Sequence, residues 1–188
     1  NPNPNPDPDP NPNPTPVYHY PPPEKSEKSK VHDESYFKIA KELGETCYRM
    51  YANSPTKVAP EIINFRPGID DFEIDAGAAH SMLRPEAVES FYHLYRATKD
   101  EKWRRYAWDV FLAIRKWGRL DQGGYANIKD VRKITKKSKG FHDDRMESFF
   151  LSETLKYIYL IFVEDGSDPL PLSEFVFNTE AHALPIRT

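Results

Sequence analysis

Proline occupies every second position of the first sixteen residues, NPNPNPDPDPNPNPTP, and this repeat decides what the N-terminus can form. Each proline fixes its own φ angle and lacks an amide donor, and it drives the preceding residue to extended angles. The repeat excludes both helix and sheet, so we expect a disordered segment of polyproline II character. Residues 17–31 continue it as a charged linker. We therefore expect a low-complexity linker over residues 1–31 and one folded domain over residues 32–188.

The overall composition limits the classes of protein to which that domain can belong. Of 188 residues, 38% are hydrophobic and 13% aromatic, which is enough for one ordinary core. A net charge of -3 gives no reason to expect nucleic acid or an anionic membrane as a partner. The longest apolar run, residues 157–163, is too short to span a bilayer, and we see no secretory signal at the start. The one cysteine, Cys47, cannot form a disulfide within the chain.

Apolar residues at helical spacing predict four helices in the domain. The first starts at Asp33 and ends before the sequence Asn-Ser-Pro, and the others cover residues 86–98, 101–120 and 144–163. The stripe of the first helix comprises Tyr36, Ile39, Ala40, Leu43, Cys47, Met50 and Tyr51.

Between and after these helices we expect an acidic loop over 66–75, a loop or short strand over 123–131, a solvated basic loop over 129–140, and a strand with a tight bend over 175–186. Paired helices joined by loops favour an α/α toroid or solenoid over a four-helix bundle.

Several glutamates lie in apolar surroundings. Glu86 and Glu89 share one face of a helix, and Glu86 lies in the first turn, where the helix dipole favours an anion. Capping electrostatics would explain both acids, with Arg84 as a weak surface partner. Glu147 and Glu153 are six residues apart, about 600° around a helix axis, so they share no narrow stripe and are typical of a solvated face.

A second pattern points toward ligands. Thr179 and Glu180 could both offer oxygen atoms to a hard cation. The sequence contains no HExxH pattern, Cys/His cluster, phosphate-binding loop or GxSxG. Acids beside aromatic rings suit a carbohydrate site, because rings stack on sugar faces and a pair of carboxylates can hydrolyse a glycosidic bond.

Six segments, in this order, resemble the C-terminal part of the class I α-1,2-mannosidases, glycoside hydrolase family 47. They are KELGETCYRMY, PEIINF, LRPEAVESFYHLYRATKD, GGYANIKDV, DRMESFFLSETLKYIYLIF and FVFNTEAHALPI. The resemblance runs from about Ser35 to Ile186, and LRPEAVES and FNTEAH are its most specific parts. It implies an all-α fold, the C-terminal part of an (αα)7 barrel of paired helices, with a short β-hairpin near the C-terminus.

The resemblance also implies a reaction and roles for the matching residues. Members of this family remove terminal α-1,2-linked mannose from high-mannose N-glycans, with inversion and with a bound Ca²⁺ ion. By resemblance, Glu86 is the general base, and Thr179 is the calcium ligand through its hydroxyl and carbonyl oxygens. The residues around the mannose, the ion and its waters are then Arg84, Phe149, Glu61, Glu89, Glu147, Glu153 and Glu180.

The chain matches only the C-terminal part of the family pattern. No segment resembles the N-terminal part of the family domain, which holds the general acid, a further essential aspartate and the disulfide partner of Cys47. Ala183 stands where the family usually has proline. We therefore expect this chain to be inactive alone, with the missing part of the barrel as a possible separate partner chain.

The alternative is a non-catalytic protein of the same fold that binds mannose glycans, for example in quality control in the endoplasmic reticulum. The resemblance implies a location in the lumen of the secretory pathway, in the endoplasmic reticulum or Golgi. Family members there are usually membrane-anchored, and no anchor is visible in this sequence.

Overall fold

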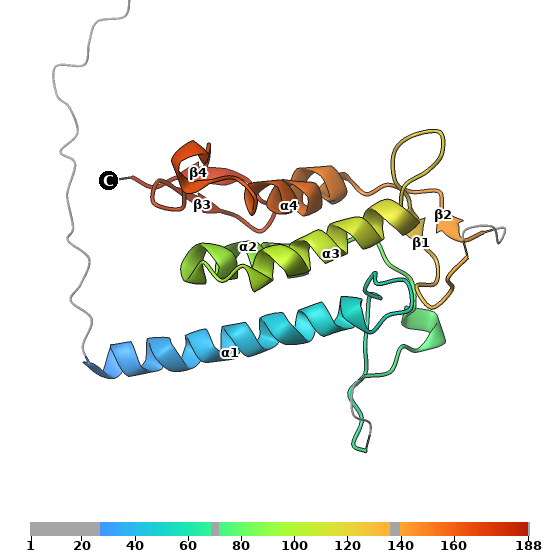
Figure 1. The fold of residues 1–188 in the computed structure, drawn as a ribbon, viewed down its shortest axis with the longest axis horizontal. Coiled ribbons are helices and arrows are strands. Elements are labelled where there is room, and N and C mark those ends of the chain that lie inside the picture. The colour runs from blue at the N-terminus through green and yellow to red at the C-terminus, as the bar shows by residue number, and fades with distance from the viewer. Residues whose placement is uncertain (1–26, 69–71, 136–139, 188) are drawn as a thin grey trace, which may run out of the picture.

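A computed structural model describes residues 27–68, 72–135 and 140–187 (Figure 1). Most of the expected linker, residues 1–26, lies outside the described residues, as do parts of the acidic and basic loops. The first helix, α1 (Glu27–Ala52), begins six residues before the expected start at Asp33. The last residues of the expected linker, 27–31, are therefore helical. Within the described residues, no helix is both long and apolar enough to cross a membrane.

The remaining elements follow the expected order. The helices are α2 (Glu86–Thr98), α3 (Lys102–Trp117) and α4 (Lys156–Leu160), with a π-helical stretch, η2 (Phe150–Leu155), leading directly into α4. Short 3-10 turns are η1 (Ala76–Ala78) and η3 (Asp165–Ser167). The strands are β1 (Asn127–Ile128), β2 (His142–Asp143), β3 (Phe175–Phe177) and β4 (Ala183–Pro185).

Helix α2 is the centre of the arrangement, because it contacts α1, α3 and α4 (Figure 1). It runs parallel to η2 and α4. The hydroxyl of Thr154 donates to the carbonyl of Leu83 just before α2, and Arg96 near the end of α2 donates to the carbonyl of Leu160 at the end of α4. Both helices therefore begin at the same end of the molecule, which places their first turns side by side.

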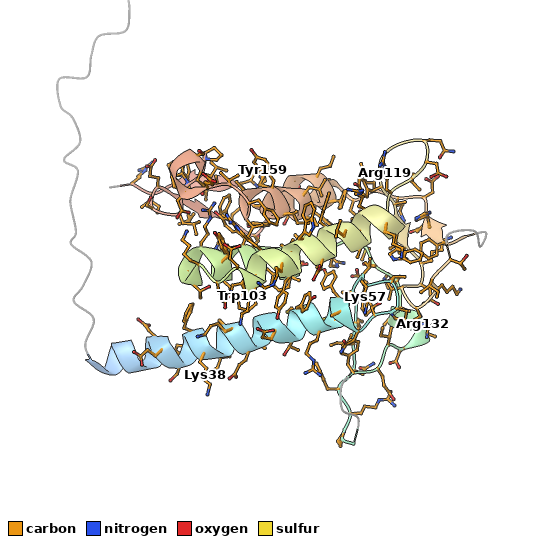
Figure 2. All side chains as sticks on the ribbon, in the orientation of Figure 1. Lys38, Lys57, Trp103, Arg119, Arg132 and Tyr159 are labelled. Carbon is orange, nitrogen blue, oxygen red and sulfur yellow. The ribbon has the colours of Figure 1, made fainter. Side chains whose placement is uncertain are left out.

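The core lies where α2 and α3 meet their neighbours. The expected stripes of these two helices are confirmed, since Phe91, Tyr92 and Trp103 are each 0% exposed. Trp103 points from α3 toward α1 (Figure 2). There it meets Gly44, where a Cβ atom would lie 3.0 Å from the ring and 2.7 Å from Leu94. A glycine inside a helix costs about 1 kcal/mol relative to alanine, and here it permits close approach of the helices.

The expected stripe of α1 is buried only near its C-terminal end. Tyr51 is 8% exposed, but Tyr36, Ile39 and Leu43 are 67%, 49% and 59% exposed. Leu94 of α2 and Trp103 of α3 approach α1 at Gly44, and the stripe before that point is exposed. A comparable surface on α3 and α4 exposes Trp108, Leu112, Tyr159 and Phe162.

Two antiparallel strand pairs complete the fold. β1 pairs with β2, with Asn127 opposite Asp143. Val131, in the segment expected to be a solvated loop, is fully buried, and its amide donates to the carbonyl of Ala79. The tight bend expected near the C-terminus is confirmed as the hairpin β3–β4, with Phe177 opposite Ala183.

Candidate active site

The first turn of α2 and the segment 147–155 meet at one end of the molecule. Glu86 is the first residue of α2 and is exposed, and Glu89 lies one turn on and is half-buried. The residue at the N-cap position, Pro85, makes no side-chain capping bond. The carboxylate of Glu86 therefore lies near the positive end of the helix dipole.

Glu61 and Arg84 form the most defined contact of the site. One Glu61 oxygen accepts from Nε of Arg84 at 2.5 Å, and the other accepts from the amide of Met82 at 2.9 Å. The Glu61 side chain is 11% exposed. This bond, together with the nearby acids, raises the pKa of Arg84 above its ordinary value. The guanidinium also lies 5.6 Å from the ring centroid of Phe149, so three of the predicted sugar-contacting residues are in one cluster.

Two further hydrogen bonds hold the carboxylates of Glu89 and Glu147. The hydroxyl of Tyr157 donates to Glu89 at 3.2 Å, linking α4 to α2. The side-chain amide of Asn127, on β1, donates to Glu147 at 3.1 Å. Sequence reasoning missed both donors. Asn127 follows a Gly-Gly pair without any pattern of its own, and Tyr157 lies in an apolar run that reads as core.

Glu153 is buried, which contradicts the expectation of a solvated face. It is 8% exposed and lies within the π-helical stretch η2. A π-helical turn contains an additional residue, so spacing based on 3.6 residues per turn misplaces side chains beyond it. Such turns are frequent at functional sites.

The C-terminal hairpin brings the remaining predicted residues to this end. The side chain of Asn178 accepts from the amides of Glu180 and His182, at 3.0 and 2.8 Å, and holds the turn. Thr179 and Glu180 are exposed in this turn. The ring of Phe177 packs 5.7 Å from that of Tyr157, which docks the hairpin on α4.

Two buried residues with left-handed backbone conformation flank the site. Leu83 has a φ of 59° just before Arg84, and Ala181 has a φ of 56° just after Glu180. This conformation costs roughly 1–2 kcal/mol for a residue other than glycine. Each carbonyl accepts a bond of 2.8 Å from the same helical segment, from Thr154 to Leu83 and from Lys156 to Ala181. The segment 154–156 thus holds both loops of the site.

The acids repel one another across these elements. Burial raises the pKa of Glu153, and the negative charges of Glu86 and Glu180 raise it further, against the opposing effect of Lys156 and His182. Burial also raises the pKa of Glu89. The Tyr157 bond lowers it, and the charges of Glu153 and Glu86 raise it. The tertiary structure therefore gathers acids that lie far apart in the sequence.

The oxygen atoms at the site can be compared with those that a calcium ion needs. Within the described residues, no group of three or more His, Cys, Asp or Glu side chains could by itself hold a metal ion. The site instead combines two features. Thr179 lies in an exposed turn, and nearby carboxylates raise the pKa of both Glu89 and Glu153, which indicates an excess of negative charge. That arrangement fits a hard cation held by a few oxygen atoms and by waters that the carboxylates bind.

Carboxylates on several elements, with an arginine and an aromatic ring among them, are the chemistry of a glycoside hydrolase site. The family follows from comparison with known sequences. The model of glycosyl hydrolase family 47 matches residues 24–186, so the chain belongs to this family.

Individual relatives agree. The chain is 43% identical over 158 residues to the endoplasmic reticulum mannosyl-oligosaccharide 1,2-alpha-mannosidase of Homo sapiens, covering 82% of this chain and 22% of that protein. It is also 43% identical over 166 residues to the mannosyl-oligosaccharide 1,2-alpha-mannosidase MNS3 of Arabidopsis thaliana, covering 80% and 26%. The chain thus spans about a quarter of the length of the curated relatives it matches.

A solved structure supports the fold. The alpha-1,2-mannosidase from Trichoderma reesei superimposes with a TM-score of 0.70 at 31% identity, over 84% of this chain and 36% of that one. The expected fold, the C-terminal part of an (αα)7 barrel with a short hairpin, is confirmed.

Proposed function

We propose that this chain is part of a calcium-dependent, inverting mannosyl-oligosaccharide 1,2-α-mannosidase that acts on high-mannose N-glycans. The observation that carries the proposal is the convergence of Glu86, Glu89, Glu153 and Glu180 from α2, η2 and the hairpin turn. The relatives, which are named mannosyl-oligosaccharide 1,2-alpha-mannosidases, supply the substrate class.

Glu86 is the proposed general base. It is exposed at the first turn of α2, where a water molecule can reach it. It takes a proton from the water while the water oxygen bonds to the anomeric carbon, and the glycosidic bond breaks on the opposite face. A general acid, ~6.5–9.5 Å from the base in inverting enzymes, protonates the leaving oxygen. In this proposal the acid comes from another part of the barrel, so this chain alone binds mannose without hydrolysing it.

Thr179 is the proposed calcium ligand, through its hydroxyl and carbonyl oxygens. When bound, Ca²⁺ would orient the attacking water and the sugar hydroxyls. Glu61, Glu89, Glu147, Glu153 and Glu180 would hold waters and sugar hydroxyls around it. Arg84, held in place by its ion pair with Glu61, and the ring of Phe149 would contact the sugar.

The other helix pairs of the barrel are the proposed cover for the two exposed apolar surfaces. One surface is the part of α1 that exposes Tyr36, Ile39 and Leu43. The other is a groove of about 610 Å³ between α3 and α4, lined by residues that include Trp108, Phe111, Tyr159 and Phe162. Exposed apolar surface of this kind marks an interaction site, and the matched solved structure is nearly three times as long as its match to this chain. Those helix pairs could belong to the same polypeptide or to a separate one.

The intact mass of the natural protein distinguishes these two cases. The protein is captured with an antibody raised against residues 165–188 and weighed. A mass near 21.8 kDa would mean that the short chain occurs as such and needs a partner chain for hydrolysis. A mass more than twice as large would place the general acid in the same polypeptide.

Substitution of the proposed base tests the reaction. In the natural protein, with its partner if it has one, Glu86→Gln should lower hydrolysis of α-1,2-mannobiose by about 10²–10⁴-fold. Chelation of calcium should also abolish hydrolysis, and Glu86→Gln should leave mannobiose binding intact. Unchanged hydrolysis in Glu86→Gln would refute the role of Glu86 as base.

The place of action proposed for the whole protein is the lumen of the secretory pathway. The support is that relatives from Homo sapiens and Rattus norvegicus are named endoplasmic reticulum mannosidases. The alternative, a protein that binds mannose glycans without cleaving them, would be favoured by calcium-dependent mannobiose binding with no hydrolysis in the complete natural protein.

A further inference from the structure

One buried polar side chain at the site has no part in the mechanism described above. Tyr157 is 1% exposed, and its hydroxyl lies 3.2 Å from a carboxylate oxygen of Glu89. An ionised carboxylate can only accept, so the phenol donates. The charged groups that act on Glu89 from α2 and η2 are Glu86 and Glu153, and both repel it. On its other side, Glu89 borders a groove that Cys47 of α1 and His93 also line, and neither of these carries a negative charge as a thiol or neutral imidazole.

The ring of Tyr157 makes a second connection. It packs 5.6 Å from the ring of Tyr92 on α2 and 5.7 Å from that of Phe177, at angles of 43° and 68°. Phe177 is the last residue of β3 and lies two positions before Thr179. One side chain thus contacts both a carboxylate of the site and the strand that leads into the turn of Thr179.

We propose that Tyr157 is a positioning residue whose hydroxyl orients the Glu89 carboxylate for sugar binding and whose ring fixes the hairpin turn relative to α2. The inference deepens the proposed function and rests on it, because the sugar-binding role of Glu89 belongs to that proposal. Without the hydroxyl, the charges of Glu86 and Glu153 still act on Glu89, and both repel it. The carboxylate then turns toward solvent or takes up a proton, and in either case it leaves the orientation in which it can accept from a sugar hydroxyl.

Two matched variants separate the hydroxyl from the ring. Tyr157→Phe keeps the ring and removes the donor. Tyr159→Phe removes a hydroxyl from the same helix two residues on, where the side chain is 66% exposed and points away from α2 (Figure 2). In the full chain, the titration of the Glu89 carboxyl carbon is followed by NMR, and the affinity for α-1,2-mannobiose is measured by calorimetry with Ca²⁺ present.

The expected result is a change in Tyr157→Phe alone. The pKa of Glu89 should rise, because the bond from Tyr157 lowers it in the wild type. Mannobiose should bind about tenfold more weakly, as expected for the loss of one hydrogen bond to a charged group. Tyr159→Phe should match the wild type in both measurements.

Three results would overturn the inference. The titration of Glu89 could be the same in Tyr157→Phe and wild type, which would mean that the hydrogen bond does not act on Glu89. The pKa could rise while mannobiose affinity stays the same, which would refute a role in sugar binding. Equal loss of affinity in both variants would show a nonspecific effect. If the wild type binds no mannobiose with or without Ca²⁺, the proposed function itself fails, and that result differs from all three.

Discussion

Glu153 is a buried acid with like charges near it. It is 8% exposed, and burial and the charges of Glu86 and Glu180 raise its pKa, while only Lys156 and His182 oppose this. A raised pKa in the folded state means that folding favours the protonated form. The contribution to stability is then full at pH values below the unfolded pKa and is lost as the pH rises through the folded pKa. At neutral pH, Glu153 therefore destabilises the fold.

Removing that charge should stabilise the chain. We expect Glu153→Gln to raise the midpoint of thermal unfolding at pH 7 without calcium. The rise should correspond to about 0.5–2 kcal/mol in the free energy of unfolding, the gain typical of a single stabilising substitution. The gain should fade as the pH falls through the raised folded-state pKa of Glu153. It should be gone below about 4.3, the ordinary pKa of glutamate, because Glu153 is then neutral in both states. Glu164→Gln, at an exposed position, is the control and should change little. A lower midpoint in Glu153→Gln at pH 7 would contradict this reading of the charge cluster.

At the scale of elements, the segment from η2 into α4 has the largest role in building the site. Thr154 and Lys156 hold the carbonyls of Leu83 and Ala181, and Tyr157 holds Glu89. One short helical segment therefore positions the loop of Glu86, the first turn of α2 and the turn of Thr179. This is possible because η2 and α4 run parallel to α2 and begin at the same end.

The contact of α1 with α2 and α3 depends on the missing side chain of Gly44. A Cβ atom there would lie 2.7 Å from Leu94 and 3.0 Å from the ring of Trp103. Leu94 can turn aside, but the Trp103 ring is fully buried and cannot. In Gly44→Ala we expect overpacking to cost about 1–3 kcal/mol and helix propensity to return about 1 kcal/mol, so the net destabilisation is up to about 2 kcal/mol.

Chemical denaturation of Gly44→Ala gives this free energy directly. Gly166→Ala is the control, since a Cβ atom at Gly166 meets nothing within 4 Å and its φ angle is not positive. A Gly44→Ala variant more stable than the wild type would mean that α1 does not approach the other helices this closely.

At the scale of the whole molecule, one buried ion pair ties the far end of α2 to the C-terminal segment. The Arg96 side chain is 8% exposed and lies 2.7 Å from that of Asp168, which is 3% exposed. Arg96 also donates to the carbonyls of Leu160 and Val163. This network fixes where the segment after α4 turns back toward the hairpin.

Breaking the pair should be costly because it leaves a buried charge without a partner. We expect Arg96→Met to destabilise the chain by about 3–5 kcal/mol. Lys99→Met, which removes an exposed ion pair with Asp165, should cost less than about 1 kcal/mol. Both are measured by urea unfolding. Similar losses of unfolding free energy in the two variants would refute the view that burial makes the Arg96 ion pair more stabilising than the exposed Lys99 pair.

The two exposed apolar surfaces also belong to this scale. The stripe of α1 has helical periodicity along its whole length, but the described chain covers only its last turns. Periodicity shows which face of a helix is apolar, and it cannot show whether another element lies against that face. For the same reason the burial of Val131 was missed, since one buried residue in a basic segment makes no periodic pattern.

The sequence by itself determined the helical class, the bounds of α2, the family and the list of candidate site residues. These depend on local spacing and on short motifs, which can be read without knowing the fold. Only the tertiary structure decided that Glu153 is buried in a π-helical turn, that Asn127 and Tyr157 supply donors to the acids, and that the hairpin turn reaches α2. The physical reason is that hydrogen bonds, burial and charge repulsion between residues far apart in the chain depend on how the helices pack, and no local pattern encodes that packing.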